Sequence, residues 1–308
     1  MKSMSPSVSA EATALSERPT STWRLALAAI RPATLTAALC PVAVGTALAA
    51  ADDAVMLLPA LFALVGALLI QIGTNLFNDY ADFKKGADTS ERLGPSRVTQ
   101  KGWMTPRQVA LSAAAAFGAA MAVGVYLVVV GGWPIVAIGL LSVLCGVAYT
   151  GGPYPLAYVG LGDVFVLVFF GLVAVGGTYY VQALTLTSTV VLASIGVGTL
   201  ATAILVVNNL RDRWTDEKVG KRTLAVRYGA GFARAEYVAL IGVAYAIPIF
   251  VWIAGTPGWM LCWLSVPMAL REIRAVLQRD GADLNPHLGR TAKLGLLYSA
   301  LLSVGVLL

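Results

Sequence analysis

Two short segments of the sequence place carboxylates and amides at helical spacing directly after long apolar runs. Their polar members are Asn75, Asn78, Asp79 and Asp82 in the first segment and Asn208, Asp212 and Asp216 in the second. Residues three, four, seven or eight positions apart share one side of a helix, so each set predicts a narrow oxygen-rich stripe. An ionised side chain within a membrane span costs about 2.5 to 3.5 kcal/mol. Groups of this kind therefore predict an ion or substrate site.

We call these segments the first and second polar stripes, and a constant spacing relates them. Asn208 and Asp212 lie 133 positions after Asn75 and Asp79, and each stripe is followed by a basic loop. The spacing predicts two parallel four-helix halves around a central cavity, with one terminal helix in addition. In that arrangement the stripes face each other across the cavity.

Opposed carboxylates suit a diphosphate bound through Mg²⁺, because this hard cation combines one or two carboxylates with substrate phosphates and water. The loops after the stripes add cations that can neutralise phosphate oxygens, namely Lys84, Lys85, Arg97, Lys101, Lys221 and Arg222. For each single cation, a role in membrane topology is an equal alternative. For each single Asp or Asn, the alternative is a solvated or capping position at a helix end. Taken together, these residues predict a site for a diphosphate leaving group.

The composition is that of an integral membrane protein. Of 308 residues, 58% are hydrophobic and 12% are charged, and the mean hydropathy is +0.76; soluble domains carry about 25% charged residues. Apolar stretches predict nine transmembrane helices, near residues 25–50, 55–77, 107–130, 133–150, 157–181, 188–210, 235–254, 258–272 and 291–308. Residues 1–22 are expected to form a disordered cytosolic tail, and residues 23–308 a single transmembrane domain.

The positive charges predict the orientation of the chain in the membrane. All 22 Lys and Arg residues lie before or early in the first span, or in the gaps after spans 2, 6 and 8 and the ends flanking them. Cytoplasmic loops carry such an excess, so the N-terminus and the loops after both stripes are predicted to be cytoplasmic. This topology largely explains the net charge of +6, and no nucleic-acid partner is expected.

A further segment, residues 148–163, is rich in Gly, Pro and Tyr and lies at the same predicted level as the stripes. Its glycines and prolines predict an ordered turn, and an interfacial tyrosine belt is the alternative reading of Tyr149 and its neighbours. Asp163 opens an apolar helix, where it either caps the helix or approaches an acceptor as a base or hydrogen-bond partner. His287 lies in a polar segment and is expected at the surface.

At these residues the chain resembles the UbiA superfamily of membrane prenyltransferases, and within it the branch that prenylates 1,4-dihydroxy-2-naphthoate in menaquinone synthesis. The resemblance runs from about Arg31 to the end of the chain, and its most specific parts are residues 78–89, 94–100 and 208–224. The wider superfamily commonly shows NDxxDxxxD in the first motif. Here Gly86 replaces the last Asp and Asp88 follows it, a departure that looks like the naphthoate branch and leaves a metal contact by Asp88 open.

The resemblance implies an all-helical fold in the bacterial inner membrane, Mg²⁺ dependence and an active site that opens to the cytoplasm. It implies transfer of a polyprenyl group from polyprenyl diphosphate to 1,4-dihydroxy-2-naphthoate, with loss of diphosphate, carbon dioxide and a proton, to give demethylmenaquinone. The expected metal ligands are Asp79, Asp82, Asp212 and Asp216 with Asn75 and Asn208. The remaining expected site residues are Asn78, Arg97, Lys101, Lys221 and Arg222 around the diphosphate and Tyr149 and Asp163 among the catalytic groups.

Two alternatives stay open at this point. Another aromatic acceptor, 4-hydroxybenzoate or homogentisate, would use the same donor site. A cation-coupled transporter also fits internal repeats and buried carboxylates, although transporter sites usually lie near the midplane of the bilayer, whereas the stripes lie at the ends of apolar runs.

Overall fold

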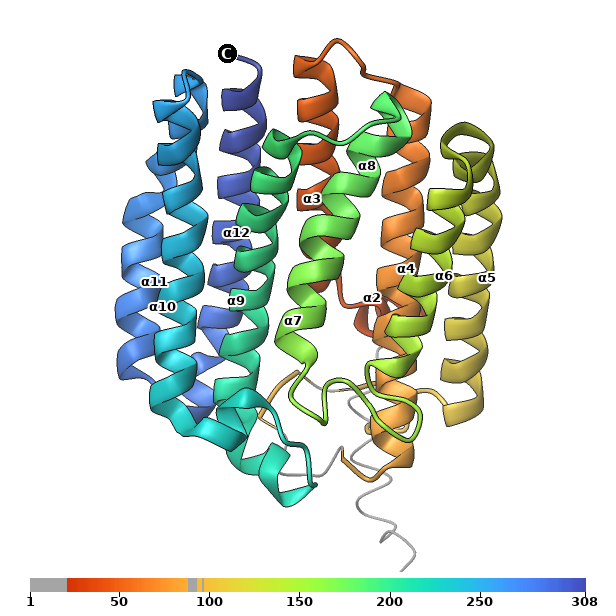
Figure 1. Cartoon of the computed structure of the whole chain (residues 1–308). Helices are drawn as coiled ribbons and strands as arrows, with labels where there is room; N and C mark the ends of the chain where they lie inside the picture. Colours follow the sequence, from red (N-terminus) through yellow and green to blue (C-terminus); the bar gives the residue numbers. More distant parts are fainter. Residues whose placement is uncertain (1–20, 88–92, 96) are drawn as a thin grey trace, which may run out of the picture.

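The computed structural model describes residues 21–87, 93–95 and 97–308, and every regular element in this part of the chain is helical. The helices run side by side as a bundle (Figure 1). The first elements are α2 (Thr22–Ile30), α3 (Pro32–Ala51), α4 (Leu57–Lys84), α5 (Pro106–Gly131) and α6 (Trp133–Ala148). The later ones are α7 (Gly162–Val166), η1 (Leu167–Val173), α8 (Ala174–Ala183), α9 (Ser188–Lys218), α10 (Leu224–Ile253), η2 (Pro257–Ser265), α11 (Val266–Gln278), η3 (Gly281–Leu284) and α12 (Asn285–Val306). Asp88 and nearly all of the predicted tail lie outside the described residues.

Six helical segments of the described chain are long and apolar enough to cross a membrane. They are α3, α4, α5, the continuous segment from α7 to α8, α9 and α10. The fourth predicted span corresponds to α6, which is shorter at 16 residues. The last two correspond to η2 with α11 and to α12, which lack the same combination of length and hydropathy. The all-helical prediction is confirmed, but the count of nine spans is not.

The first predicted span is interrupted instead of forming one continuous helix. Arg31 separates α2 from α3 and adopts a left-handed conformation with φ of 54°. The ring of Pro32 disfavours the helical conformation at the preceding residue, and Pro is well suited to the first turn of a new helix. The chain therefore turns at Arg31 instead of continuing as one helix.

The helices that carry the stripes are longer than the predicted apolar runs. α4 has 28 residues and α9 has 31. Both continue through their polar stripes without a helix breaker and end beside a lysine, Lys84 or Lys218, in the last turn. A cation is favourable there because the C-terminal end of a helix carries partial negative charge. The stripes are thus faces of continuous helices, as their spacing predicts.

The main hydrophobic core joins α3 to the C-terminal helices. Its fully buried members include Val44 on α3, Leu200 on α9 and Tyr298 on α12. A smaller cluster around Leu76 and Val109 packs α4 against α5. The terminal helix α12, predicted as an addition to two four-helix halves, contacts α3, α9 and η2. The division into halves stays a prediction.

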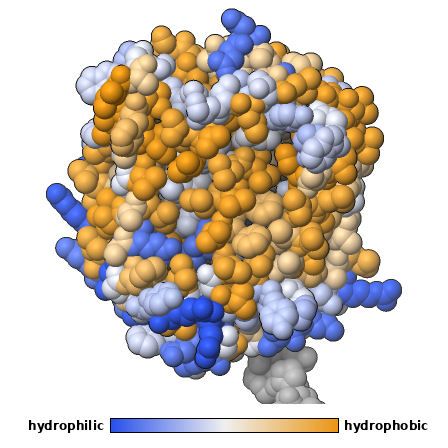
Figure 2. All heavy atoms as spheres, in the orientation of Figure 1, coloured by the Kyte–Doolittle hydropathy of each residue, from blue (hydrophilic) through white to orange (hydrophobic). Residues whose placement is uncertain are grey.

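On the face that Figure 2 shows, apolar side chains cover most of the middle of the bundle, and hydrophilic ones gather mainly at its lower end. This is the end at which α4 and α9 finish (Figure 1), and we call it the motif end. Large exposed apolar residues such as Val129, Leu144 and Phe250 lie on α5, α6 and α10. Water would penalise such a surface, whereas lipid does not. The chain is a multi-pass membrane protein.

Two glycines allow α9 to cross the α7–α8 segment at backbone contact. A Cβ on Gly171 would lie 2.5 Å from the carbonyl oxygen of Ser194, and one on Gly198 would lie 2.8 Å from that of Leu167. Small residues at membrane helix interfaces permit this approach. The contact fixes α9, and with it the second stripe, against the helix that begins near Asp163.

We expect Gly198→Ala to destabilise the protein, because its methyl group would meet the backbone of η1. Overpacking of this kind costs about 1–3 kcal/mol, so the unfolding temperature in detergent should fall by several degrees. Gly242→Ala on α10 is the matched control, since a Cβ there meets nothing within 4 Å. An equal unfolding temperature for both variants would contradict the backbone contact.

Candidate active site

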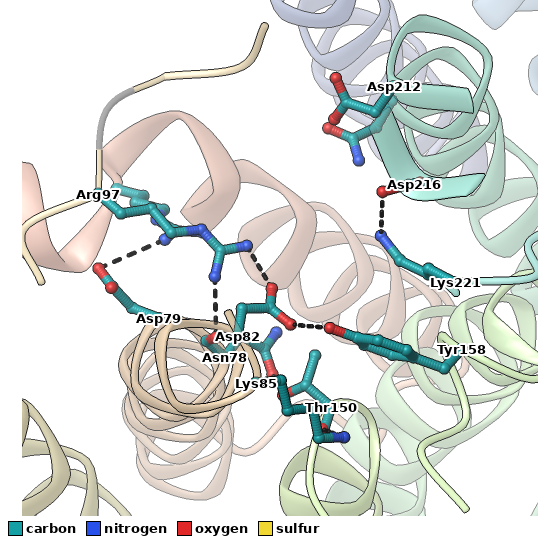
Figure 3. A network of polar contacts seen from close by, with 12 residues as sticks. Asn78, Asp79, Asp82, Lys85, Arg97, Thr150, Tyr158, Asp212, Asp216 and Lys221 are labelled. Atoms are coloured by element: carbon teal, nitrogen blue, oxygen red, sulfur yellow. Dashed lines mark hydrogen bonds and ion pairs between the residues drawn. The ribbon is translucent and has the colours of Figure 1, made fainter. Parts of the chain in front are cut away.

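The two polar stripes lie at the motif end and face one space. Figure 3 shows Asp79 and Asp82 on one side of it and Asp212 and Asp216 on the other. All four are buried, with 2–8% of their surface exposed. The carboxylates of Asp82 and Asp216 are close enough to interact electrostatically. The predicted juxtaposition of the two polar stripes is therefore found in the fold.

In the first stripe, Asp82 is held by groups from two different loops. Arg97 Nη2 lies 2.6 Å from Asp82 Oδ2, and the hydroxyl of Tyr158 donates to Asp82 Oδ1 at 2.8 Å (Figure 3). Arg97 also donates from Nη1 to the carbonyl oxygen of Asn78 at 2.8 Å. Lys101 follows in the same turn, and its backbone N–H donates to the carbonyl oxygen of Arg97 at 3.0 Å. Arg97 thus neutralises the buried carboxylate of Asp82.

Asp79 is bound from one side only. Its Oδ2 accepts a hydrogen bond from the backbone N–H of Val98 at 3.1 Å and lies 3.7 Å from Arg31 Nη2. Its Oδ1 is buried and has no hydrogen-bond partner among the described residues. This oxygen is available to a ligand.

In the second stripe, Asp212 is neutralised by its neighbour on the helix. Arg211 is 1% exposed and donates from Nε and Nη2 to both carboxylate oxygens of Asp212, at 2.8 and 2.6 Å. Nη2 also donates to Asn208 Oδ1 at 2.7 Å. A buried charge is tolerated only when it is paired and hydrogen-bonded, and Arg211 meets this condition for Asp212.

Asp216 resembles Asp79 in having one oxygen left over. Lys221 Nζ donates to Asp216 Oδ1 at 3.3 Å, whereas Oδ2 is buried without a partner in the described chain. Lys221 also interacts electrostatically with Asp82 and Asp163, so its ammonium group serves both stripes. The side chain of Arg222 is exposed; its contribution here is a backbone N–H that donates to the carbonyl oxygen of Tyr158 at 2.9 Å.

The three predicted amides brace the site. Asn75 donates to the carbonyl oxygen of Ile30 at 3.2 Å and to Thr34 Oγ1 at 2.7 Å, which ties α4 to the turn at Arg31. The side-chain oxygen of Asn78 accepts from Thr150 Oγ1 at 2.7 Å, and that of Asn208 accepts from Arg211, as described above.

Tyr149, directly after α6, and Asp163, the second residue of α7, lie at the two ends of the segment that joins these helices. The hydroxyl oxygen of Tyr149 would lie 3.1 Å from a Cβ on Gly162. Burial raises the pKa of Tyr149, and the carboxylates of Asp163, Asp82 and Asp216 raise it further. Asp163 is 5% exposed and its Oδ1 has no partner within the described residues. A neutral phenol and a carboxyl group therefore adjoin the space between the stripes.

The sequence assigned no role to Tyr158, Thr150 or Arg211, and it indicated Lys85 only as one of the cations that could neutralise phosphate oxygens. Lys85 Nζ donates to the carbonyl oxygen of Thr150 at 2.6 Å and lies 4.5 Å from the ring centre of Tyr158. Burial and the Asp82 carboxylate both raise the pKa of Tyr158, which keeps its proton available for Asp82. The one available signal was the position of Arg211, three residues after Asn208 and next to Asp212.

The donor set fits a hard divalent cation held jointly by the protein and a phosphate ligand. One unpartnered carboxylate oxygen comes from each stripe, on Asp79 and on Asp216. No group of three or more His, Cys, Asp or Glu side chains within the described residues is arranged to hold a metal alone. Mg²⁺ is usually bound in this way, through one or two carboxylates plus substrate phosphates.

The chain is similar in sequence to known membrane prenyltransferases. Residues 38–292 match the UbiA prenyltransferase family. The chain is 36% identical to 1,4-dihydroxy-2-naphthoate octaprenyltransferase of Escherichia coli over 96% of this chain and 98% of that one. It is 38% identical to the protein of the same name from Mycobacterium tuberculosis, over 90% and 94%.

Solved structures show the same fold. A UbiA homologue from Archaeoglobus fulgidus, solved bound to DMAPP and Mg²⁺, superimposes with a TM-score of 0.62 at 15% identity, over 91% of this chain and 99% of that one. The apo UbiA homologue from Aeropyrum pernix gives a TM-score of 0.64 at 15% identity, over 85% and 96%. The chain belongs to the UbiA prenyltransferase family.

Proposed function

We propose that this protein transfers a polyprenyl group from polyprenyl diphosphate to 1,4-dihydroxy-2-naphthoate, with loss of diphosphate and carbon dioxide, to give demethylmenaquinol, the reduced form of demethylmenaquinone. The observation that carries the proposal is the pair of buried stripes that face one space, each with one unpartnered carboxylate oxygen. The names of relatives at 36% and 38% identity support the choice of acceptor.

The donor half of the reaction belongs to the stripes. Asp79 and Asp216 would hold Mg²⁺ through their unpartnered oxygens, with Asp82 and Asp212 completing the acidic set. Bound there, Mg²⁺ would offset the charge of the diphosphate and make it a better leaving group. Lys221 and Arg97 already lie against stripe carboxylates, so their positive charges are directed to the place where negative charge develops.

We assign binding of the aromatic acceptor to residues at the two ends of the segment between α6 and α7. The phenol of Tyr149 and the carboxyl group of Asp163 adjoin the donor site, where they can hydrogen-bond the ring hydroxyls of a dihydroxy aromatic acid. The new carbon–carbon bond forms at the ring carbon that bears the carboxylate, as the allylic carbon–oxygen bond breaks. Loss of carbon dioxide then returns an electron pair to the ring.

The positive charge of the motif end supports an orientation with this end in the cytoplasm. There the water-soluble acceptor and the diphosphate product exchange with solvent, while the apolar sides of the bundle (Figure 2) meet the bilayer and the prenyl chain. The proposed location is the bacterial cytoplasmic membrane.

The acceptor is tested by incubating purified protein in detergent with Mg²⁺, a polyprenyl diphosphate and, in separate reactions, each candidate aromatic acid. Mass spectrometry should find the decarboxylated, prenylated product of 1,4-dihydroxy-2-naphthoate and much less product from 4-hydroxybenzoate or homogentisate. Detergent allows no ion gradient, so turnover also separates a transferase from a transporter. Preferred turnover of another acid would overturn the assignment of the acceptor.

Removing the charge of either carboxylate that has an unpartnered oxygen should abolish most of the activity. We expect Asp79→Asn and Asp216→Asn each to lower kcat by about 100-fold or more at saturating Mg²⁺, the size of effect seen when one charge-stabilising group is lost. Asp53→Asn, in the exposed turn before α4, is the matched control and should behave like the wild type. Near-normal turnover of either stripe variant would contradict the assignment of the site.

Tyr158→Phe tests the hydrogen bond that orients Asp82. A hydrogen bond to a charged group is worth about 1.5–3 kcal/mol, so kcat/KM for the prenyl diphosphate should fall about tenfold or more. The phenylalanine ring preserves the contact with Lys85. Tyr154→Phe removes an exposed hydroxyl from the same segment and should leave the rate unchanged. Equal rates for the two variants would show that the bond to Asp82 has no role in the reaction.

A further inference from the structure

Asn285, the first residue of α12, connects the second stripe to the loop that follows the first. Its Oδ1 accepts a hydrogen bond from Arg211 Nη1 at 3.0 Å, and its Nδ2 donates to the carbonyl oxygen of Leu93 at 2.9 Å. A guanidinium can only donate and a carbonyl can only accept, so these two partners determine the orientation of the amide. Both ends of the side chain are used.

Asn285 gives Arg211 a hydrogen-bond acceptor from outside α9. The other hydrogen bonds of this buried guanidinium go to Asp212 and Asn208, on the same helix. Among the described residues, Asn285 is the one side chain from another helix that binds it. The hydrogen bond to Asn285 therefore fixes the orientation of the guanidinium plane of Arg211. Because this guanidinium binds both carboxylate oxygens of Asp212, the orientation of the Asp212 carboxylate is fixed as well.

The start of α12 is itself firmly held. His287 Nδ1 lies 2.6 Å from Glu272 Oε2 on α11, and Thr291 Oγ1 lies 3.0 Å from the hydroxyl of Tyr237 on α10. His287 and Thr291 are 1% and 0% exposed. The amide of Asn285 is thus presented from a rigid helix, which suits a residue that orients others.

We propose that Asn285 is a positioning residue for the diphosphate site, acting through Arg211 on Asp212 and Asn208. Its second hydrogen bond goes to Leu93, four residues before Arg97, so one side chain contacts groups near both stripes. This inference rests on the proposed donor site and gives the terminal helix a role in it. It does not depend on which aromatic acid is the acceptor.

Asn285→Ala removes both hydrogen bonds and keeps the helix. Outer-shell residues of metal sites typically contribute about 10–100-fold in metal affinity or activity. We expect the Mg²⁺ concentration for half-maximal rate to rise about tenfold and kcat/KM for the prenyl diphosphate to fall by a similar factor, while KM for the aromatic acid stays within twofold. Gln278→Ala, which truncates an exposed amide at the end of α11, is the control and should match the wild type.

A double-mutant cycle with Arg211→Lys tests the route of the effect. If Asn285 acts through Arg211, adding Asn285→Ala to Arg211→Lys costs little more than Arg211→Lys alone. Fully additive losses would overturn the proposal. So would a lowered unfolding temperature with unchanged kinetic constants, since that result assigns Asn285 to stability only.

A second readout separates this inference from the proposed function. Mg²⁺-dependent binding of a non-reactive prenyl thiolodiphosphate needs no acceptor, so it can be measured even if the naphthoate is not the substrate. Binding weakened about tenfold in Asn285→Ala supports the positioning role on its own. If Asn285→Ala binds the thiolodiphosphate as tightly as the wild type does, and the wild type converts the naphthoate, the role of Asn285 is contradicted and the proposed function stands.

Discussion

The structure depends on one constraint, which is that carboxylates buried at the ends of membrane-crossing helices must be neutralised by groups brought from elsewhere in the chain. Asp82 contacts Arg97 and Tyr158, and Asp216 contacts Lys221. A buried charge without such partners costs several kcal/mol. The described parts of the loops at the motif end therefore contact the stripe carboxylates.

This constraint also shapes the enclosure around the site. In the segment between α6 and α7, the hydroxyl of Tyr158 donates a hydrogen bond to Asp82. The carbonyl oxygen of Tyr158 accepts one from the backbone N–H of Arg222, in the loop after α9. Gly160 has a φ of 76° and a Cβ there would lie 3.0 Å from the carbonyl oxygen of Arg222, so this crossing needs glycine. The neutralising contacts satisfy most carboxylate oxygens and leave one on each stripe for a ligand.

The sequence predicts what is local or periodic and misses what is decided by distant contacts. Helical spacing correctly places each stripe on one face, because this needs only the geometry of a single helix. The hydrogen bond between Tyr158 and Asp82 joins residues 76 positions apart, and no sequence pattern predicts it. The prediction that His287 lies at the surface is wrong, because Glu272 on the neighbouring helix provides a buried partner for it. Asn285 lies in a polar segment without any motif, and only the packing of α12 brings it to Arg211.

The central claim is that both stripes hold one divalent cation together with a diphosphate, and Mn²⁺ used in place of Mg²⁺ makes this directly measurable. Electron paramagnetic resonance should show tight Mn²⁺ binding to the wild type only when a prenyl thiolodiphosphate is present. Either Asp79→Asn or Asp216→Asn alone should remove that binding. Tight Mn²⁺ binding without the diphosphate, or binding that survives the loss of one of these carboxylates, would contradict a site shared by the two stripes.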